Sequence, residues 1–188
     1  MTTQTSQKTQ VTQATQAAAS GTATAAAPGA VPAAAPGAAH RHGPRLSWAK
    51  LAPEVYQAML ALDAAATQGL DPTLVELVKI RASQLNHCAF CIDKHIKDAR
   101  QAGETEQRIY LLDAWEEATG FYSPEEQAAL ALTEAVTLLT EGFVPDAVYD
   151  RAAALFAPAE LARLLALITT INAWNRFGVS TRMTPGRA

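Results

Sequence analysis

The residues best suited to chemistry lie in one short stretch, Asn86 to His95, which reads NHCAFCIDKH. It contains both cysteines of the chain, Cys88 and Cys91, and two of its four histidines, His87 and His95. A Cys-x-x-Cys pair can form a reversible disulfide or bind a metal ion. A histidine four residues after the second cysteine could assist either kind of chemistry.

The residues after Cys88 have the pattern of an amphipathic helix, in which charged and apolar side chains alternate from position 92 to position 100. On a helix, Cys88 and Cys91 are three residues apart and Cys91 and His95 four apart, so all three share one face. Cα atoms at this spacing are separated by roughly 5–6 Å, which suits a disulfide. Cys88 would lie at the helix N-terminus, where free amides and the helix dipole stabilise a thiolate. The geometry therefore favours a reversible dithiol.

Two other interpretations remain open. The spacing of Cys88, Cys91 and His95 could bind zinc, with His87 or a water molecule as the fourth ligand. Structural zinc sites commonly take their remaining ligands from a second cluster, and the chain has no further cysteine. Alternatively, the dithiol is a redox-sensitive element that controls contacts between subunits without catalysis.

The composition divides the chain into two regions. Residues 1–44 are mostly Thr, Gln, Ala, Pro and Gly, without an acidic or aromatic residue, and are predicted to be disordered. Residues 45–188 are predicted to form one domain. We expect no signal peptide or membrane span, and the net charge of −3, with acids and bases mixed, argues against nucleic-acid binding. Two cysteines close together suit a reducing compartment, so a cytoplasmic protein is expected.

Proline and capping signals predict that the folded region is all-α, with about six to seven helices. Asp71 precedes Pro72 as an N-cap residue, and Ser123 with Glu126 forms a capping box. A turn is predicted at 47–50. The predicted helices are 53–66, 72–86, 89–102, 106–118 with a break near 113, 124 to just before Gly142, 145–156, and from 158 onward. Several carry apolar residues on more than one face, which predicts burial between subunits.

Residues 76–100, ELVKIRASQLNHCAFCIDKHIKDAR, resemble the core of the AhpD-like alkylhydroperoxidases of the carboxymuconolactone decarboxylase superfamily. The family pattern is a Glu, a Cys-x-x-Cys that begins twelve residues later, and a His four residues after the second Cys. It corresponds here to Glu76, Cys88, Cys91 and His95. A looser similarity extends over most of the folded region. The resemblance implies an all-helical fold that assembles into trimers or hexamers, with the dithiol near a subunit interface.

The resemblance also implies a thiol-dependent peroxidase of antioxidant defence. Cys91 would be the peroxidatic cysteine, Cys88 the resolving cysteine, His95 the proton acceptor, and Glu76 the residue that orients the imidazole. No bound cofactor or metal is expected. The redox-active disulfide would instead be restored by an external thiol or lipoyl-type donor, and Cys88, nearer the helix end, is the expected point of attack.

The chain departs from some members of the family at Phe90, where they carry a histidine that completes the proton relay, so weaker peroxidase activity is expected. The decarboxylases of the superfamily lack the dithiol, which argues against lactone decarboxylation. Taken alone, Glu76 could be a solvated residue paired with Lys79. Trp115 and Trp174 are predicted to be packing residues.

Overall fold

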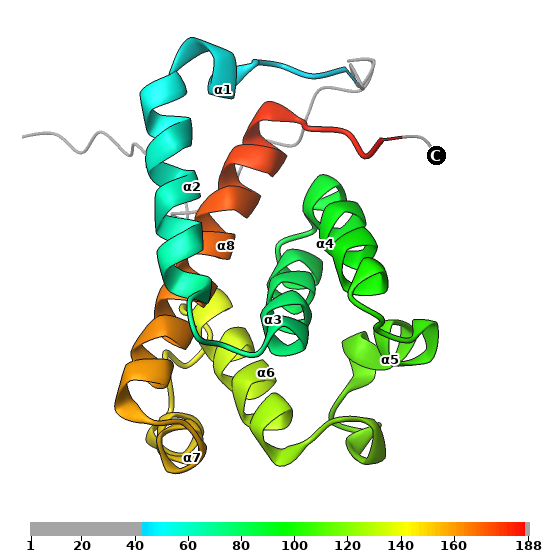
Figure 1. Cartoon of the computed structure of the whole chain (residues 1–188), viewed down its shortest axis with the longest axis vertical. Helices are drawn as coiled ribbons and strands as arrows, with labels where there is room; N and C mark the ends of the chain where they lie inside the picture. Colours follow the sequence, from blue (N-terminus) through cyan, green and yellow to red (C-terminus); the bar gives the residue numbers. More distant parts are fainter. Residues whose placement is uncertain (1–42, 187–188) are drawn as a thin grey trace, which may run out of the picture. The chain divides into compact units, whose positions relative to one another are not determined.

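The computed structural model describes residues 43–186. Within that range the chain forms eight α-helices and two 3-10 helices and no β-strand, so the predicted all-α fold is confirmed (Figure 1). The predicted disorder of residues 1–44 concerns a segment that lies, except for positions 43 and 44, outside the described residues. The elements are α1 (Trp48–Leu51), α2 (Pro53–Thr67), α3 (Pro72–Leu85), α4 (Ala89–Gln101), α5 (Glu106–Leu111), η1 (Leu112–Ala114), η2 (Thr119–Phe121), α6 (Pro124–Thr137), α7 (Asp146–Leu155) and α8 (Pro158–Thr181).

The helix starts follow the local signals of the sequence. The Asp71 carboxylate accepts a hydrogen bond from the Leu74 amide at 3.0 Å, which caps α3. Ser123 and Glu126 form both bonds of the predicted capping box at the start of α6. Three differences concern short segments and ends. The four-residue helix α1 overlaps the predicted turn at 47–50, and α6 ends at Thr137 rather than just before Gly142. The helix predicted over 106–118 is wrong beyond its first part: α5 ends at Leu111, η1 follows to Ala114, and residues 115–117 form a turn.

Helix α3 separates two apolar clusters and therefore occupies the centre of the domain (Figure 1). Its residues Leu74 and Val78 pack with α2, α6 and α8, whereas Leu77 and Ile80 pack against α4, α5 and η1. Because successive faces of α3 are buried on different sides, its remaining polar side chains must find partners at the helix–helix seams. None of the helices in the described part is long and apolar enough to cross a membrane.

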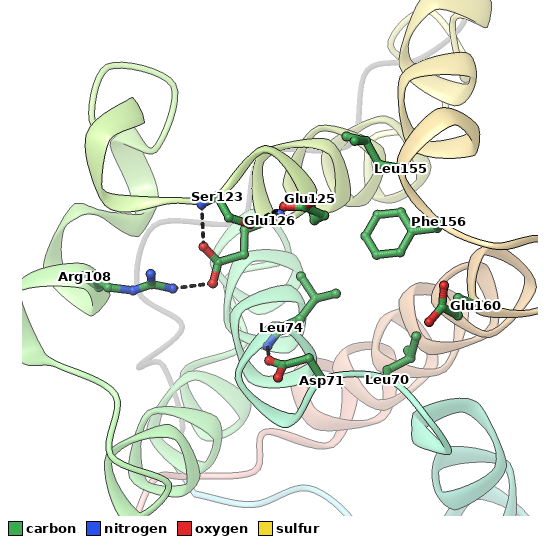
Figure 2. Close-up of a pocket in the computed structure, with 10 residues that line it drawn as sticks. All are labelled: Leu70, Asp71, Leu74, Arg108, Ser123, Glu125, Glu126, Leu155, Phe156 and Glu160. Atoms are coloured by element: carbon green, nitrogen blue, oxygen red, sulfur yellow. Dashed lines mark hydrogen bonds and ion pairs between the residues drawn. The ribbon is translucent and has the colours of Figure 1, made fainter.

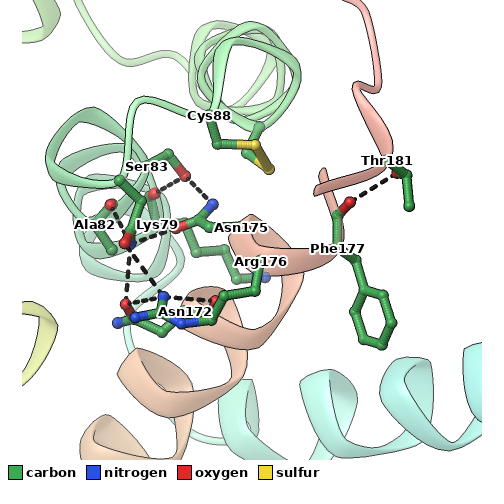
Figure 3. The surroundings of a disulfide bond; sticks show 11 residues. Lys79, Ala82, Ser83, Cys88, Asn172, Asn175, Arg176, Phe177 and Thr181 are labelled. Atoms are coloured by element: carbon green, nitrogen blue, oxygen red, sulfur yellow. Dashed lines mark hydrogen bonds between the residues drawn. A yellow bond between two sulfur atoms is a disulfide. The ribbon is translucent and has the colours of Figure 1, made fainter. Parts of the chain in front are cut away.

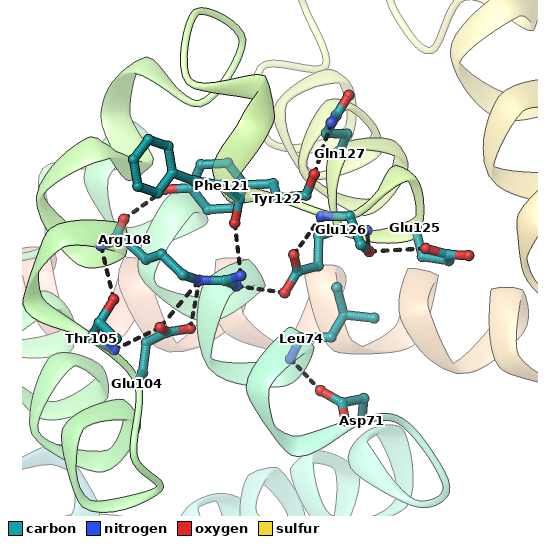
Figure 4. Close-up of polar contacts among 11 residues, drawn as sticks. Asp71, Leu74, Glu104, Thr105, Arg108, Phe121, Tyr122, Glu125, Glu126 and Gln127 are labelled. Atoms are coloured by element: carbon teal, nitrogen blue, oxygen red, sulfur yellow. Dashed lines mark hydrogen bonds and ion pairs between the residues drawn. The ribbon is translucent and has the colours of Figure 1, made fainter.

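A polar network around Arg108 holds α5 to the start of α6 (Figure 4). The guanidinium donates hydrogen bonds to Glu104 and Glu126 and lies 5.1 Å from the centre of the Tyr122 ring. The Tyr122 hydroxyl donates to the carbonyl oxygen of Arg108 at 2.6 Å. Burial raises the pKa of Tyr122 to about 12. This network contains none of the predicted site residues and serves to hold α5 against the start of α6.

Candidate active site

The turn that joins α3 to α4 is held by two asparagines of α8. The side-chain amide of Asn86 donates to Asn172 Oδ1 at 2.9 Å and to Asn175 Oδ1 at 3.0 Å. His87 follows with a positive φ of 54° and an exposed side chain. Cys88 is then the N-cap residue of α4. The turn thus reverses the chain and lays α4 along α3, while α8 fixes the position of the first cysteine.

Cys88 and Cys91 are joined in a disulfide, with their Cα atoms 5.4 Å apart. The bond lies beside the end of α8 (Figure 3), and both cysteines are buried, at 1% and 5% exposure. Gly178 of α8 faces the sulfurs: a Cβ at this position would lie 2.7 Å from Cys88 Sγ and 3.4 Å from Cys91 Sγ. A glycine is therefore required for α8 to approach the disulfide this closely. Gly178 was not among the site residues predicted from the sequence, although a glycine within a long helical pattern is a recognised signal of close packing.

His95 lies one turn after Cys91 on α4 and contacts a carboxylate of α3. Its Nδ1 is 2.8 Å from Glu76 Oε2, and the side chain is 10% exposed. A carboxylate partner favours the tautomer with the proton on Nδ1, which leaves Nε2 free to accept a proton. The alternative pairing of Glu76 with Lys79 is wrong, because the buried Lys79 ammonium forms its ion pair with Asp63 at 2.9 Å.

Asp98 is a second carboxylate close to the histidine, three residues further along α4. Its Oδ2 lies 3.9 Å from His95 Nδ1. Among the described residues, Glu76, His95 and Asp98 are a set whose ligand atoms all lie within 4.8 Å of one another. The zinc interpretation instead placed both cysteine sulfurs on the ion, and in this structure those sulfurs are bonded to each other. The i, i+3 spacing from His95 could have identified Asp98 in the sequence.

A cavity of about 280 Å³ opens onto Cys91 and His95. Its walls include Trp48, Tyr56 and Trp174, from α1, α2 and α8, whose ring centres lie 5.5–5.8 Å apart. Trp174 therefore lines a cavity as well as packing against neighbours. We call this cavity the aromatic pocket. It is lined by Trp48, Ala49, Tyr56, Leu60, Asp63, Lys79, Phe90, Cys91, Lys94, His95, Asp98, Trp174 and Met183.

A larger cavity, of about 490 Å³, lies where α3, α6 and α8 begin (Figure 2). Three of its four carboxylates are engaged in helix capping: Asp71, Glu126 and Glu160 each accept a hydrogen bond from a backbone amide at the start of a helix. Leu155 and Phe156 form part of its apolar wall. No cysteine or histidine lines this cavity, whereas Cys91 and His95 both line the aromatic pocket.

The fold and the site together define a helical Cys-x-x-Cys protein in which a disulfide lies one turn from a histidine–carboxylate pair. The chain matches the model of the carboxymuconolactone decarboxylase family over residues 53–135. It is also 46% identical to the uncharacterised protein YdfG of Bacillus subtilis over 137 residues, which are 72% of this chain and 92% of YdfG. The chain belongs to the carboxymuconolactone decarboxylase family.

Two solved structures extend the comparison. One is ATU0492 of Agrobacterium tumefaciens, a protein of unknown function described as a candidate antioxidant defence protein AhpD. It is 35% identical, has a TM-score of 0.75, and matches over 78% of this chain and all of its own. The other, an uncharacterised peroxidase-related protein of Silicibacter sp. TM1040, has a TM-score of 0.62 at 18% identity over 71% of each chain, a likeness of fold alone. These similarities agree with the AhpD-like resemblance of residues 76–100. The roles assigned to Glu76, Cys88, Cys91 and His95 stay predictions.

Proposed function

We propose that the protein is a thiol-dependent peroxidase that reduces organic hydroperoxides. The observation that carries this proposal is the position of Cys91 and His95: both line the aromatic pocket, and Glu76 Oε2 contacts Nδ1 of the imidazole. Activated thiol nucleophiles require a base within reach and a third group that orients that base. The likeness to ATU0492, which is described as a candidate antioxidant defence protein, supports a role in antioxidant defence.

In the proposed cycle, His95 Nε2 takes the proton of the reduced Cys91 thiol, directly or through water. The Cys91 thiolate attacks the terminal oxygen of the hydroperoxide, a sulfur–oxygen bond forms, the O–O bond breaks, and the leaving alkoxide takes the proton from His95 to become an alcohol. The Cys88 thiol then condenses with the sulfenic acid of Cys91, which forms the disulfide and releases water. An external dithiol reduces the disulfide and is itself oxidised.

The walls of the aromatic pocket support an organic rather than an inorganic peroxide. Tyr56, Leu60, Phe90 and Trp174 surround the approach to Cys91 with largely apolar surface. Such surface stabilises a bound alkyl or aryl group by removing it from water and offers hydrogen peroxide little comparable contact. Cumene hydroperoxide should therefore be consumed with a higher kcat/KM than hydrogen peroxide.

The proposal is tested by measuring hydroperoxide consumption with a panel of dithiol donors. Cys91→Ser should abolish turnover. Cys88→Ser should accumulate a sulfenic acid on Cys91, detectable by mass spectrometry after dimedone labelling, with slow turnover at most. A sulfenic acid on Cys88 in the Cys91→Ser protein, formed at the wild-type rate, would reverse the two roles. Absence of thiol-dependent consumption with every donor would reject the peroxidase function.

A His95→Gln variant separates the peroxidase from the zinc interpretation. Removing the base should lower turnover by about 10²–10⁴-fold with a nearly unchanged melting curve, since the disulfide can still form. A zinc ligand would behave differently, because its loss should release metal and lower thermal stability. About one zinc per chain in the purified protein, surviving dialysis, together with thermal collapse of His95→Gln, would favour the metal site.

We also propose that the protein assembles with copies of itself, as a trimer or hexamer. Apolar side chains on α1 and α2 support this: Leu51, Val55 and Leu62 are 69%, 41% and 45% exposed. Apolar groups concentrated on neighbouring helices are commonly covered by another subunit. Light scattering coupled to size-exclusion chromatography should give a mass three or six times that of the chain. Leu51→Glu should lower that mass, and a wild-type monomer would contradict the proposal.

A further inference from the structure

The two sulfurs of the disulfide differ in their surroundings. Cys91 lines the aromatic pocket, whereas Cys88 does not and is only 1% exposed. On the side of α8, Gly178 leaves too little space for even a Cβ beside Cys88 Sγ, at 2.7 Å, while the corresponding separation from Cys91 Sγ is 3.4 Å. Figure 3 shows this end of α8 beside the disulfide. A reagent that enters the aromatic pocket therefore meets Cys91.

We propose that the external thiol enters the aromatic pocket and attacks Sγ of Cys91, so that Cys88 is the leaving sulfur. This inference rests on the proposed peroxidase function, in which a thiol donor completes the cycle. It reverses the expectation from the sequence, which selected Cys88 because of its terminal position on α4. The two sulfurs are chemically similar, so access determines which one an external thiol attacks. Helix α8 covers Cys88, the sulfur that the sequence favoured.

The exchange proceeds in two balanced steps. The donor thiolate forms a bond to Cys91 Sγ, the Cys88–Cys91 bond breaks, and Cys88 leaves as a thiolate that later takes up a proton. The second thiol of the donor then attacks the donor sulfur of the mixed disulfide, which releases Cys91 as a thiolate and the donor as a disulfide. Cys88 is the N-cap residue of the thirteen-residue helix α4. The free amides there stabilise the negative charge of the leaving sulfur.

A consequence is that reductant and peroxide use the same pocket in turn. The pocket selects thiols with a compact, apolar body, because Trp48, Tyr56 and Trp174 form much of its wall and its volume is about 280 Å³. Glutathione, with two carboxylates, an ammonium group and three residues, fits such a space poorly. Phenylmethanethiol is therefore expected to reduce the disulfide faster than glutathione at the same thiolate concentration.

Attack is mapped on the oxidised full-length protein. The protein is mixed with phenylmethanethiol, quenched with acid at early times, and alkylated with N-ethylmaleimide. Residues 82–94 form one tryptic peptide, and fragmentation at Ala89 and Phe90 distinguishes the two cysteines. The thiol adduct should be on Cys91 and the maleimide on Cys88, in about tenfold excess over the reverse pattern. Equal labelling, or an adduct mainly on Cys88, would overturn the proposal.

A pair of variants in α2 tests the route. Leu60 lines the aromatic pocket, whereas the exposed Gln57 of the same helix does not. Leu60→Trp should slow reduction by phenylmethanethiol about tenfold and Gln57→Trp should leave it unchanged. Equal rates in the two variants would overturn the route. Hydroperoxide consumption by the wild type is measured in parallel: an adduct on Cys91 without turnover rejects the peroxidase function alone, and turnover with an adduct on Cys88 rejects the route alone.

Discussion

Replacing Gly178 by alanine has two opposing effects whose balance depends on the redox state. In an ordinary helix interior, Gly→Ala stabilises a protein by about 1 kcal/mol. Here the new Cβ would lie 2.7 Å from Cys88 Sγ, well inside contact distance. Overpacking of this kind costs roughly 1–3 kcal/mol. The oxidised Gly178→Ala protein should therefore be less stable than the wild type by roughly 0–2 kcal/mol.

The reduced protein should respond differently. In the disulfide, Cys88 Sγ is tied to Cys91 Sγ and cannot move independently, whereas the free thiol can rotate about χ1 away from the added methyl group. Reduced Gly178→Ala should then keep most of the helix-propensity gain of about 1 kcal/mol. A difference of roughly 1–3 kcal/mol between the two states corresponds to a reduction potential about 20–60 mV less negative than that of the wild type.

Urea unfolding of the oxidised and reduced proteins, with a redox titration of each, measures both quantities. Ala162→Gly is the matched control, since Ala162 is exposed on the same helix and reports the propensity difference alone. If Gly178→Ala stabilised both redox states equally, by the amount that Ala162→Gly destabilises them, and left the reduction potential unchanged, the predicted clash with Cys88 would be wrong.

Three further predictions concern polar groups. Glu76→Gln should lower hydroperoxide turnover by about 10–100-fold, less than His95→Gln can, because it disturbs only the orientation of the base; equal losses in stopped-flow assays would show that Glu76 has a larger role. Asp63→Ala leaves the buried Lys79 ammonium without its partner and should destabilise the fold by roughly 3 kcal/mol. Lys79→Met should cost only about 1 kcal/mol, because the remaining Asp63 side chain is 25% exposed and can be hydrated. Urea unfolding that gives the reverse order would contradict this prediction. Burial raises the pKa of Tyr122 from 10.0 in the unfolded chain to about 12 in the folded protein. The protonated phenol therefore contributes fully to the free energy of unfolding below pH 10, and this contribution is lost as the pH rises through 12. Tyr122→Phe should lose less stability than the wild type between these pH values, and equal losses would assign the alkaline transition to other groups.

The helices and the cysteine motif could be predicted from the sequence because they depend on neighbours along the chain. A capping box, a proline at the first helical position, or the i, i+3 spacing of Cys88 and Cys91 acts within about one helical turn. His95 follows one turn later, so the same period places it beside Cys91. The pattern of Glu76 twelve residues before the motif indicated a further member of the site, by resemblance rather than by local geometry.

Tertiary structure alone decided which partners these residues meet. Glu76 pairs with His95 rather than Lys79 because the turn at Asn86, held by two asparagines of α8, lays α4 along α3. The aromatic pocket joins Trp48 to Trp174, which lie 126 positions apart. Helix α8 packs against the disulfide so closely at Gly178 that it covers Cys88. Cys91 therefore lines the aromatic pocket and Cys88 does not. Such contacts depend on how helices cross, and helix crossing depends on the packing of the whole core rather than on any local pattern.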